Sequence, residues 1–192
     1  MSAGANALPP RGPAGPSRDA TATIGMAIFL GAVGMLFAAL FFAYAVMRAQ
    51  APAWPPVGVA PLPRGTLGLN TLVLVAASLA LRGARGATRR DQPARARLRV
   101  RAALALGAAF LAAQVTIWHA LATSGAGPGS GIYGSVFFAF SGLHALHVAG
   151  GLVALALIAA RGAGARGLGA CVLYWDFVLV VWLLFYVSAC LA

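Results

Sequence analysis

The stretch from Ile132 to Ala160 reads IYGSVFFAFSGLHALHVAGGLVALALIAA and decides the fold class. Its 29 residues exceed the roughly 20 that an α-helix needs to cross about 30 Å of hydrocarbon. Four other apolar segments have comparable composition, and all but the second are also longer than 20 residues: Ile24–Met47, Gly65–Leu81, Ala102–Thr123 and Leu168–Ala192. The pattern therefore predicts an all-α, polytopic membrane bundle with five transmembrane helices.

The composition agrees with a membrane protein. Hydrophobic residues make up 61% of the 192 residues and charged residues 9%, against roughly 45–50% and about 25% in soluble domains. The only acids are Asp19, Asp91 and Asp176, so a hydrolase built on paired carboxylates is not expected. The net charge of +11 comes from arginines placed between apolar runs rather than on a soluble face, so nucleic acid is not an expected partner either.

The chain divides into a tail and one membrane domain. Residues 1–22 are rich in Pro, Gly and Ala and show no periodicity, which predicts a disordered cytoplasmic N-terminal tail. Residues 23–192 are predicted to form a single five-helix transmembrane domain.

The arginines predict the orientation of this domain. With the N-terminus inside, twelve of the fourteen arginines fall on the inner side, and only Arg48 and Arg64 lie outside. The positive-inside rule then places the N-terminus in the cytoplasm and the C-terminus outside. Eight inner arginines share one loop, which we expect to signal topology and to contact anionic headgroups: Arg82, Arg85, Arg89, Arg90, Arg95, Arg97, Arg99 and Arg101.

Few polar side chains lie within the spans. Because each is expensive in hydrocarbon, we expect it to be buried against protein and hydrogen-bonded, as a structural contact between helices. The residues in this class are Asn70, Gln114, His144, His147 and Asp176.

His144 and His147 are three residues apart and share one helix face. This spacing raises the alternative of a metal or haem site, since imidazole is a common ligand. The depth of the remaining histidine, His119, would differ by about 10 Å, and no Cys, Glu or other His that could also bind the metal is near. Hydrogen bonding between helices is therefore favoured, and no catalytic residue, metal ligand or cofactor site is predicted in this chain. A b-type cytochrome or a small transporter would require features that the sequence lacks.

Asp176 lies about eight residues from the inner end of the last span. A lone carboxylate there should pair with a polar neighbour or stay protonated. The preceding span is antiparallel to it, so we expect contact with His147 or His144, as a structural lock rather than a proton relay.

Three motifs carry a resemblance to a known family. They are FFAY at 41–44 leading into WPPVG at 54–58, LNTLVL at 69–74, and YGSVFF at 133–138 followed by SGLHALHV at 141–148. Together with Gln114, Trp118 and the last span, they resemble subunit III of the haem–copper oxidases, in particular cytochrome c oxidase. The resemblance covers about residues 24–190 and corresponds to the short form with five helices.

This resemblance implies a subunit that is not itself catalytic within a proton-translocating terminal oxidase of aerobic respiration. It implies packing against subunit I and also subunit II, bound phospholipid, and support for the stability and proton uptake of the complex. Haem and copper are expected in the partner subunits, cytochrome c as electron donor, and the bacterial inner (plasma) membrane as location. The alternative within the resemblance is a related five-helix accessory subunit of a quinol oxidase or nitric oxide reductase.

The sequence departs from the family at its membrane carboxylates. Ala32 and Ile117 stand where the family commonly has acids, and the final-helix pattern reads Asp176, Phe177, Val178, Leu179 instead of His, Phe, Val, Asp. A proton-antenna role is therefore not transferred, and the two histidines are carried over only as structural contacts.

Overall fold

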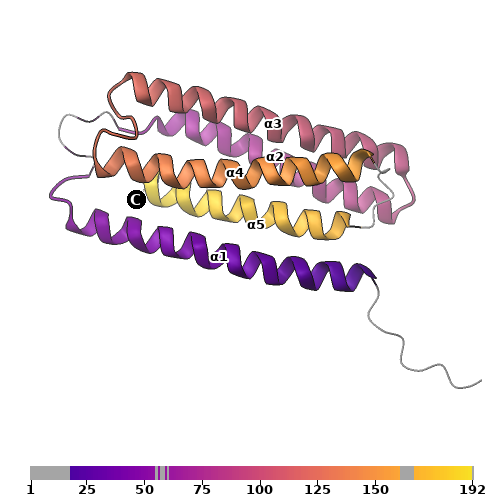
Figure 1. Ribbon diagram of the computed structural model, residues 1–192. Helices are drawn as coiled ribbons and strands as arrows, with labels where there is room; N and C mark the ends of the chain where they lie inside the picture. The colour runs from indigo at the N-terminus through magenta and orange to yellow at the C-terminus, as the bar shows by residue number, and fades with distance from the viewer. Residues whose placement is uncertain (1–17, 55, 57–58, 60, 161–166, 192) are drawn as a thin grey trace, which may run out of the picture.

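The structure is a computed structural model, and it describes residues 18–54, 56, 59, 61–160 and 167–191. Within these residues it contains long helices that lie side by side and alternate in direction, and no strand (Figure 1). The helices are α1 (Arg18–Gln50), α2 (Arg64–Arg89), α3 (Pro93–Thr123), α4 (Ile132–Ala160) and α5 (Leu168–Tyr186), and α5 continues into a π-helix, η1 (Val187–Leu191). All five α-helices are long and apolar enough to span a membrane, which confirms the predicted fold class.

Both ends of α4, the last residue of α3 and the first residue of α5 coincide with the limits of the predicted apolar segments, and the other helix ends differ from them. α1 already begins at Arg18, ahead of the predicted start at Ile24. The predicted tail falls mostly on residues 1–17, which lie outside the described residues.

The arginine-rich segment, expected as a loop, is a helical hairpin instead. α2 runs on to Arg89 and α3 begins at Pro93, so only a short turn around Asp91, at φ 53°, separates them. Alanine and arginine are among the strongest helix formers, and proline suits the first position of a helix. The hydropathy of the sequence falls after Leu81, but the helix continues to Arg89. The fall in hydropathy thus marks the end of the apolar part of α2, not the end of the helix.

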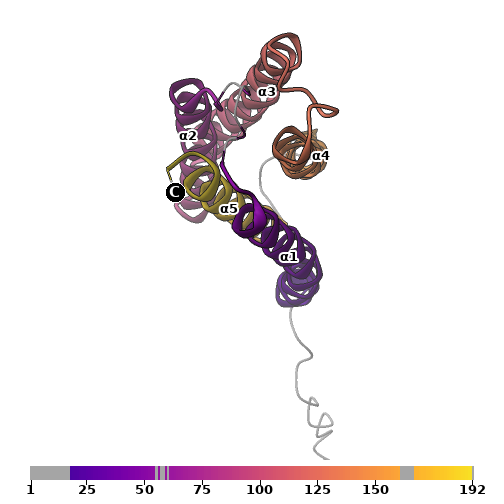
Figure 2. The same ribbon diagram turned by 90° about the vertical axis from the view of Figure 1, so that its left-hand side faces the viewer.

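α5 lies in the middle of the bundle when the helices are viewed from one end (Figure 2). It packs against α1, α2 and α4, while α3 packs against α2 and α4. α1 lies at the edge of the bundle. Among the described residues, its packing partners are α5 and, to a smaller extent, α4. Most of its surface therefore faces outward, including Ile28, Met35 and Phe42.

Large aromatic side chains fill the space between the helices. Trp175 and Trp182 of α5 are buried, and Phe140 of α4 stacks on Phe185 with ring centroids 4.1 Å apart. Gly107 of α3 makes room for one of these rings, because a Cβ there would lie 2.7 Å from Trp175 Cη2. Such close packing is what holds helices together in lipid, where burial of apolar surface contributes little.

Candidate functional site

Asp176 is held by α2. Ser78 Oγ donates a hydrogen bond of 2.7 Å to Asp176 Oδ1, and Arg82 Nε donates one of 2.8 Å to the same oxygen. Ser78 and Arg82 are one turn apart on α2, so both reach the same carboxylate. The Asp176 side chain is 25% exposed and that of Arg82 58%, which places the pair at the surface of the bundle.

The prediction that Asp176 contacts His147 or His144 is therefore wrong. The hydrogen bond from α5 to His147 of α4 comes from Tyr174 instead, whose hydroxyl donates to the main-chain oxygen of His147 at 2.7 Å. Two residues correspond to a rotation of about 200° around a helix. If Tyr174 faces α4, Asp176 must face the opposite flank, where α2 lies.

The two histidines make ring contacts or local hydrogen bonds. His147 Nδ1 lies 2.8 Å from the carbonyl oxygen of Leu143 on its own helix, so this nitrogen carries the proton. His144 is fully buried, and neither of its ring nitrogens has a hydrogen-bond partner among the described residues. Its ring stacks on Trp182, with centroids 4.8 Å apart. His144 thus joins α4 to α5, but by ring packing rather than by the expected hydrogen bond.

Asn70 of α2 and Gln114 of α3 lie together between their helices. Asn70 Nδ2 donates to Gln114 Oε1 at 3.2 Å and, more weakly, to the carbonyl oxygen of Phe110 at 3.4 Å. Both side chains are buried. This buried amide pair joins α2 to α3, where the apolar surroundings offer few alternative partners.

Two tryptophans join further helices through hydroxyl groups. Trp182 Nε1 donates to Thr71 Oγ1, and Trp118 Nε1 donates to Ser141 Oγ, each at 2.9 Å. Thr71 and Ser141 also donate to carbonyl oxygens of the preceding turn of their own helices. These hydroxyl groups were not predicted from the sequence as contacts between helices. A serine or threonine in any helix can donate to a carbonyl oxygen of the preceding turn, so its presence does not indicate a partner on another helix.

A polar cluster at the end of the bundle opposite the arginine hairpin was also missed. Tyr44 Oη donates to the Ser188 carbonyl oxygen at 2.9 Å, and one Arg48 Nη donates to that oxygen at 2.8 Å and to Tyr44 Oη at 3.0 Å. We call Tyr44, Arg48 and Ser188 the outer clamp. It ties the end of α1 to a carbonyl group of η1, across most of the length of the sequence.

All eight arginines of the α2–α3 hairpin are exposed. Besides Arg82, Arg99 also makes a contact between helices, since one of its Nη atoms donates to the Gly83 carbonyl oxygen at 2.8 Å. A side chain at position 83 would collide with this guanidinium. The buried faces of the hairpin consist of small residues, Ala84, Ala87 and Ala96, which allow α2 and α3 to approach closely.

The described residues do not fit a metal or haem site. They contain no group of three His, Cys, Asp or Glu side chains that could hold a metal ion. His144 is fully buried and lies against the rings of Phe37, Phe110 and Trp182.

The similarity to known proteins extends over all the helices of the bundle. A family model described as cytochrome c oxidase subunit III matches residues 16–191, which include every helix. The chain belongs to the cytochrome c oxidase subunit III family. It is 32% identical over 171 residues to cytochrome c oxidase subunit 3 of Synechocystis sp., with 85% of this chain and 72% of that protein covered. It is 34% identical over 180 residues to the probable cytochrome c oxidase subunit 3 of Nocardia farcinica, with coverages of 87% and 86%.

A third relative, the probable cytochrome c oxidase subunit 3 of Mycobacterium leprae, is 35% identical over 176 residues and again covers 87% and 86%. The resemblance inferred from the motifs is thus confirmed. The chain is a multi-pass membrane subunit III of a haem–copper oxidase of the respiratory chain, and it belongs to a complex with other oxidase subunits.

The family motifs supply many of the contacts between helices. LNTLVL contains Asn70 and Thr71, and SGLHALHV contains Ser141 and His144. Each of these four side chains contacts a tryptophan or an amide of another helix. These four residues of the family motifs therefore serve to join helices in this chain.

Proposed function

We propose that this chain is a structural subunit that packs against subunit I of the oxidase, with subunit II as a second neighbour, in the bacterial inner membrane. The haem and copper centres would be held by those partners, and cytochrome c would supply the electrons. The observation that carries the proposal is the family match through all five helices, together with polar groups that are used to join helices to one another.

The proposed orientation places the N-terminus in the cytoplasm. It is supported by the eight exposed arginines at the α2–α3 turn, because arginine is retained on the cytoplasmic side during insertion. The opposite end carries only Arg48 and Arg64, and Arg48 is engaged in the outer clamp.

Bound phospholipid belongs to the same proposal. A groove of about 330 Å³ runs between α1, α4 and α5, with Met26, Phe29, Gly151 and Tyr174 among its apolar walls. Gly167 at the start of α5 marks its inner end, and the arginine hairpin lies at that same end of the bundle (Figure 1). An acyl chain suits the groove, and a phosphate group suits the arginines.

The test is to purify the chain with an affinity tag from its native membrane. We expect the haem- and copper-bearing subunits to copurify, and the complex to oxidise reduced cytochrome c with uptake of oxygen. Isolation of the chain by itself, or with haem bound to it alone, contradicts the proposal. A complex that accepts electrons from quinol, or that reduces nitric oxide, contradicts the choice of electron donor or of reaction.

The lipid component is tested separately on the same preparation. Phospholipid should stay bound through detergent exchange, and replacing Ala154, an exposed residue that lines the groove, by leucine should release part of it. Unchanged lipid content in a correctly assembled variant contradicts this component and leaves the assignment as an oxidase subunit untouched.

A further inference from the structure

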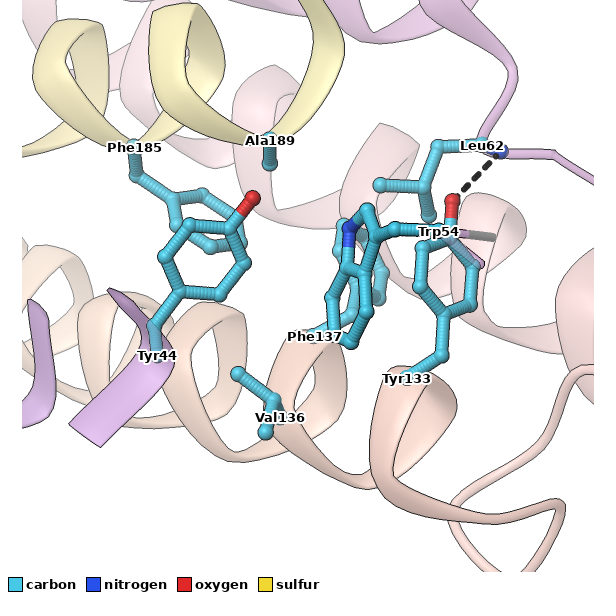
Figure 3. A pocket seen from close by; sticks show the side chains of 8 residues that line it. All are labelled: Tyr44, Trp54, Leu62, Tyr133, Val136, Phe137, Phe185 and Ala189. Atoms are coloured by element: carbon cyan, nitrogen blue, oxygen red, sulfur yellow. Dashed lines mark hydrogen bonds between the residues drawn. The ribbon is translucent and has the colours of Figure 1, made fainter. Parts of the chain in front are cut away.

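A small cavity lies beside the outer clamp, where the end of α1, the α1–α2 connection, α4 and α5 meet (Figure 3). Its volume is about 10 Å³. It is lined by Tyr44, Trp54, Leu62, Tyr133, Val136, Phe137, Phe185 and Ala189. Figure 3 shows the Tyr44 hydroxyl and the Trp54 indole nitrogen on two sides of this space, both turned toward it.

The indole N–H of Trp54 is the unmatched polar group at this cavity. Trp54 Nε1 is buried and has no hydrogen-bond partner among the described residues. An indole N–H can only donate, so it requires an acceptor. The ring itself is held edge-on between Tyr44 and Tyr133, with centroids 5.7 and 5.0 Å away, so it is not free to turn outward.

The Tyr44 hydroxyl still has acceptor capacity. It donates to the Ser188 carbonyl oxygen and accepts from Arg48. A hydroxyl oxygen has two acceptor lone pairs, and Arg48 uses one of them. A molecule that accepts from Trp54 and donates to Tyr44 would satisfy both groups.

We propose that the cavity holds one ordered water molecule, which accepts a hydrogen bond from Trp54 Nε1 and donates one to Tyr44 Oη. The volume is at the lower limit for a single water, about 10–15 Å³, so a larger solute is excluded. The water connects Trp54, in the α1–α2 connection, to the outer clamp. This connection matters because α1 is the edge helix and its outer end is held by polar contacts to η1.

The primary test is a density map of the intact oxidase complex at a resolution that shows ordered water. We expect density within hydrogen-bond distance of both Trp54 Nε1 and Tyr44 Oη. A cavity without density in such a map overturns the proposal.

Ultraviolet resonance Raman spectroscopy of the same complex gives a second readout, because indole bands report whether the N–H is hydrogen-bonded. Subtracting the spectrum of the Trp54→Phe complex from that of the wild type isolates the Trp54 signal. We expect the bonded position in the wild type. Replacing Val136 by isoleucine adds a methyl group to the wall of the cavity and leaves all three residues of the outer clamp in place, and it should move the signal to the unbonded position.

The matched control is Val153→Ile on the same helix, where the side chain is 62% exposed, and the Trp54 signal should not move. An unbonded signal in the wild type overturns the proposal. So does a bonded signal that persists in an assembled Val136→Ile complex. If Val136→Ile does not assemble, the wild-type signal and the density map still decide.

Discussion

At the scale of single residues, the direction in which a side chain points decides what it can do. Tyr174 and Asp176 are only two positions apart on α5, yet the first bonds to α4 and the second to α2. Asp176 is thereby an ion-pair partner of Arg82 rather than part of a histidine cluster. Its charge is matched within the chain, which accounts for a carboxylate close to the apolar zone.

Replacing Asp176 by asparagine should lower the free energy of unfolding by about 1 kcal/mol. The amide oxygen can still accept from Ser78 and Arg82, but the hydrogen bonds lose their charge assistance, and the exposure of Arg82 limits the loss. Titration with sodium dodecyl sulfate, followed by circular dichroism, measures the change. Asp91→Asn is the control, because Asp91 is exposed and asparagine accepts its positive φ. Equal stability of the Asp176 variant and the control would count against the ion pair.

A second residue-scale prediction concerns the glycine that faces Trp175. Gly107→Ala should destabilise the fold by about 1–3 kcal/mol, because the new methyl group would lie 2.7 Å from Trp175 and 2.8 Å from Leu152. Gly142→Ala on α4 is the matched control, since no atom lies within 4 Å of its Cβ position. That substitution should be neutral or stabilise by up to about 1 kcal/mol. The same detergent titration separates the two, and a neutral Gly107→Ala would show that the ring can move.

At the scale of elements, α1 differs from the other four helices. It packs least extensively against the other helices, and two of the features that attach it are the outer clamp at its end and Phe37 at its middle. The Phe37 ring is buried against Phe140 and His147, with centroids 5.4 and 5.1 Å away. Leu30 and Val33 are also buried on this side, whereas most of the remaining surface of the helix faces outward.

Phe37→Ala should therefore weaken the attachment of α1 by about 3 kcal/mol, the usual cost of truncating a buried phenylalanine. Phe42→Ala removes the same atoms from the same helix at a position that is 74% exposed, and should change stability by less than about 0.5 kcal/mol. The detergent concentration at which the bundle unfolds measures both. Equal effects of the two variants would mean that Phe37 does not anchor α1.

At the scale of the whole molecule, charge is distributed unequally between the two ends. The α2–α3 hairpin presents eight exposed arginines, whereas the other end uses Arg48 to bind a main-chain oxygen. The arginine-rich end is thus suited to contact with anionic headgroups and water. The other end is closed by aromatic rings around Trp54 and Tyr133.

The orientation can be measured with single cysteines in a chain whose Cys171 and Cys190 are replaced by alanine. A cysteine at Gly129, in the α3–α4 connection, should react with a membrane-impermeant maleimide added to intact cells. A cysteine at Arg90, in the hairpin turn, should react only after the membrane is permeabilised. Both positions are exposed, so burial does not confuse the result. The reverse pattern of labelling contradicts the proposed orientation.

The sequence by itself determined the number of helices, the membrane environment and the family. Hydropathy acts over about 20 consecutive residues, and the motifs are contiguous, so both can be read along the chain. It also identified Asn70, Gln114, His144 and Asp176 as polar groups that need partners in an apolar zone.

Only the tertiary structure decided which groups those partners are. Asn70 meets Gln114, Asp176 meets Ser78 and Arg82, and His144 meets aromatic rings. The helical extent of the arginine hairpin, the outer clamp and the cavity beside Trp54 also appear only there. The physical reason is that a partner depends on the rotation of each helix about its axis and on its depth relative to its neighbours. Both follow from how large rings and small residues pack between helices, which no stretch of one helix contains.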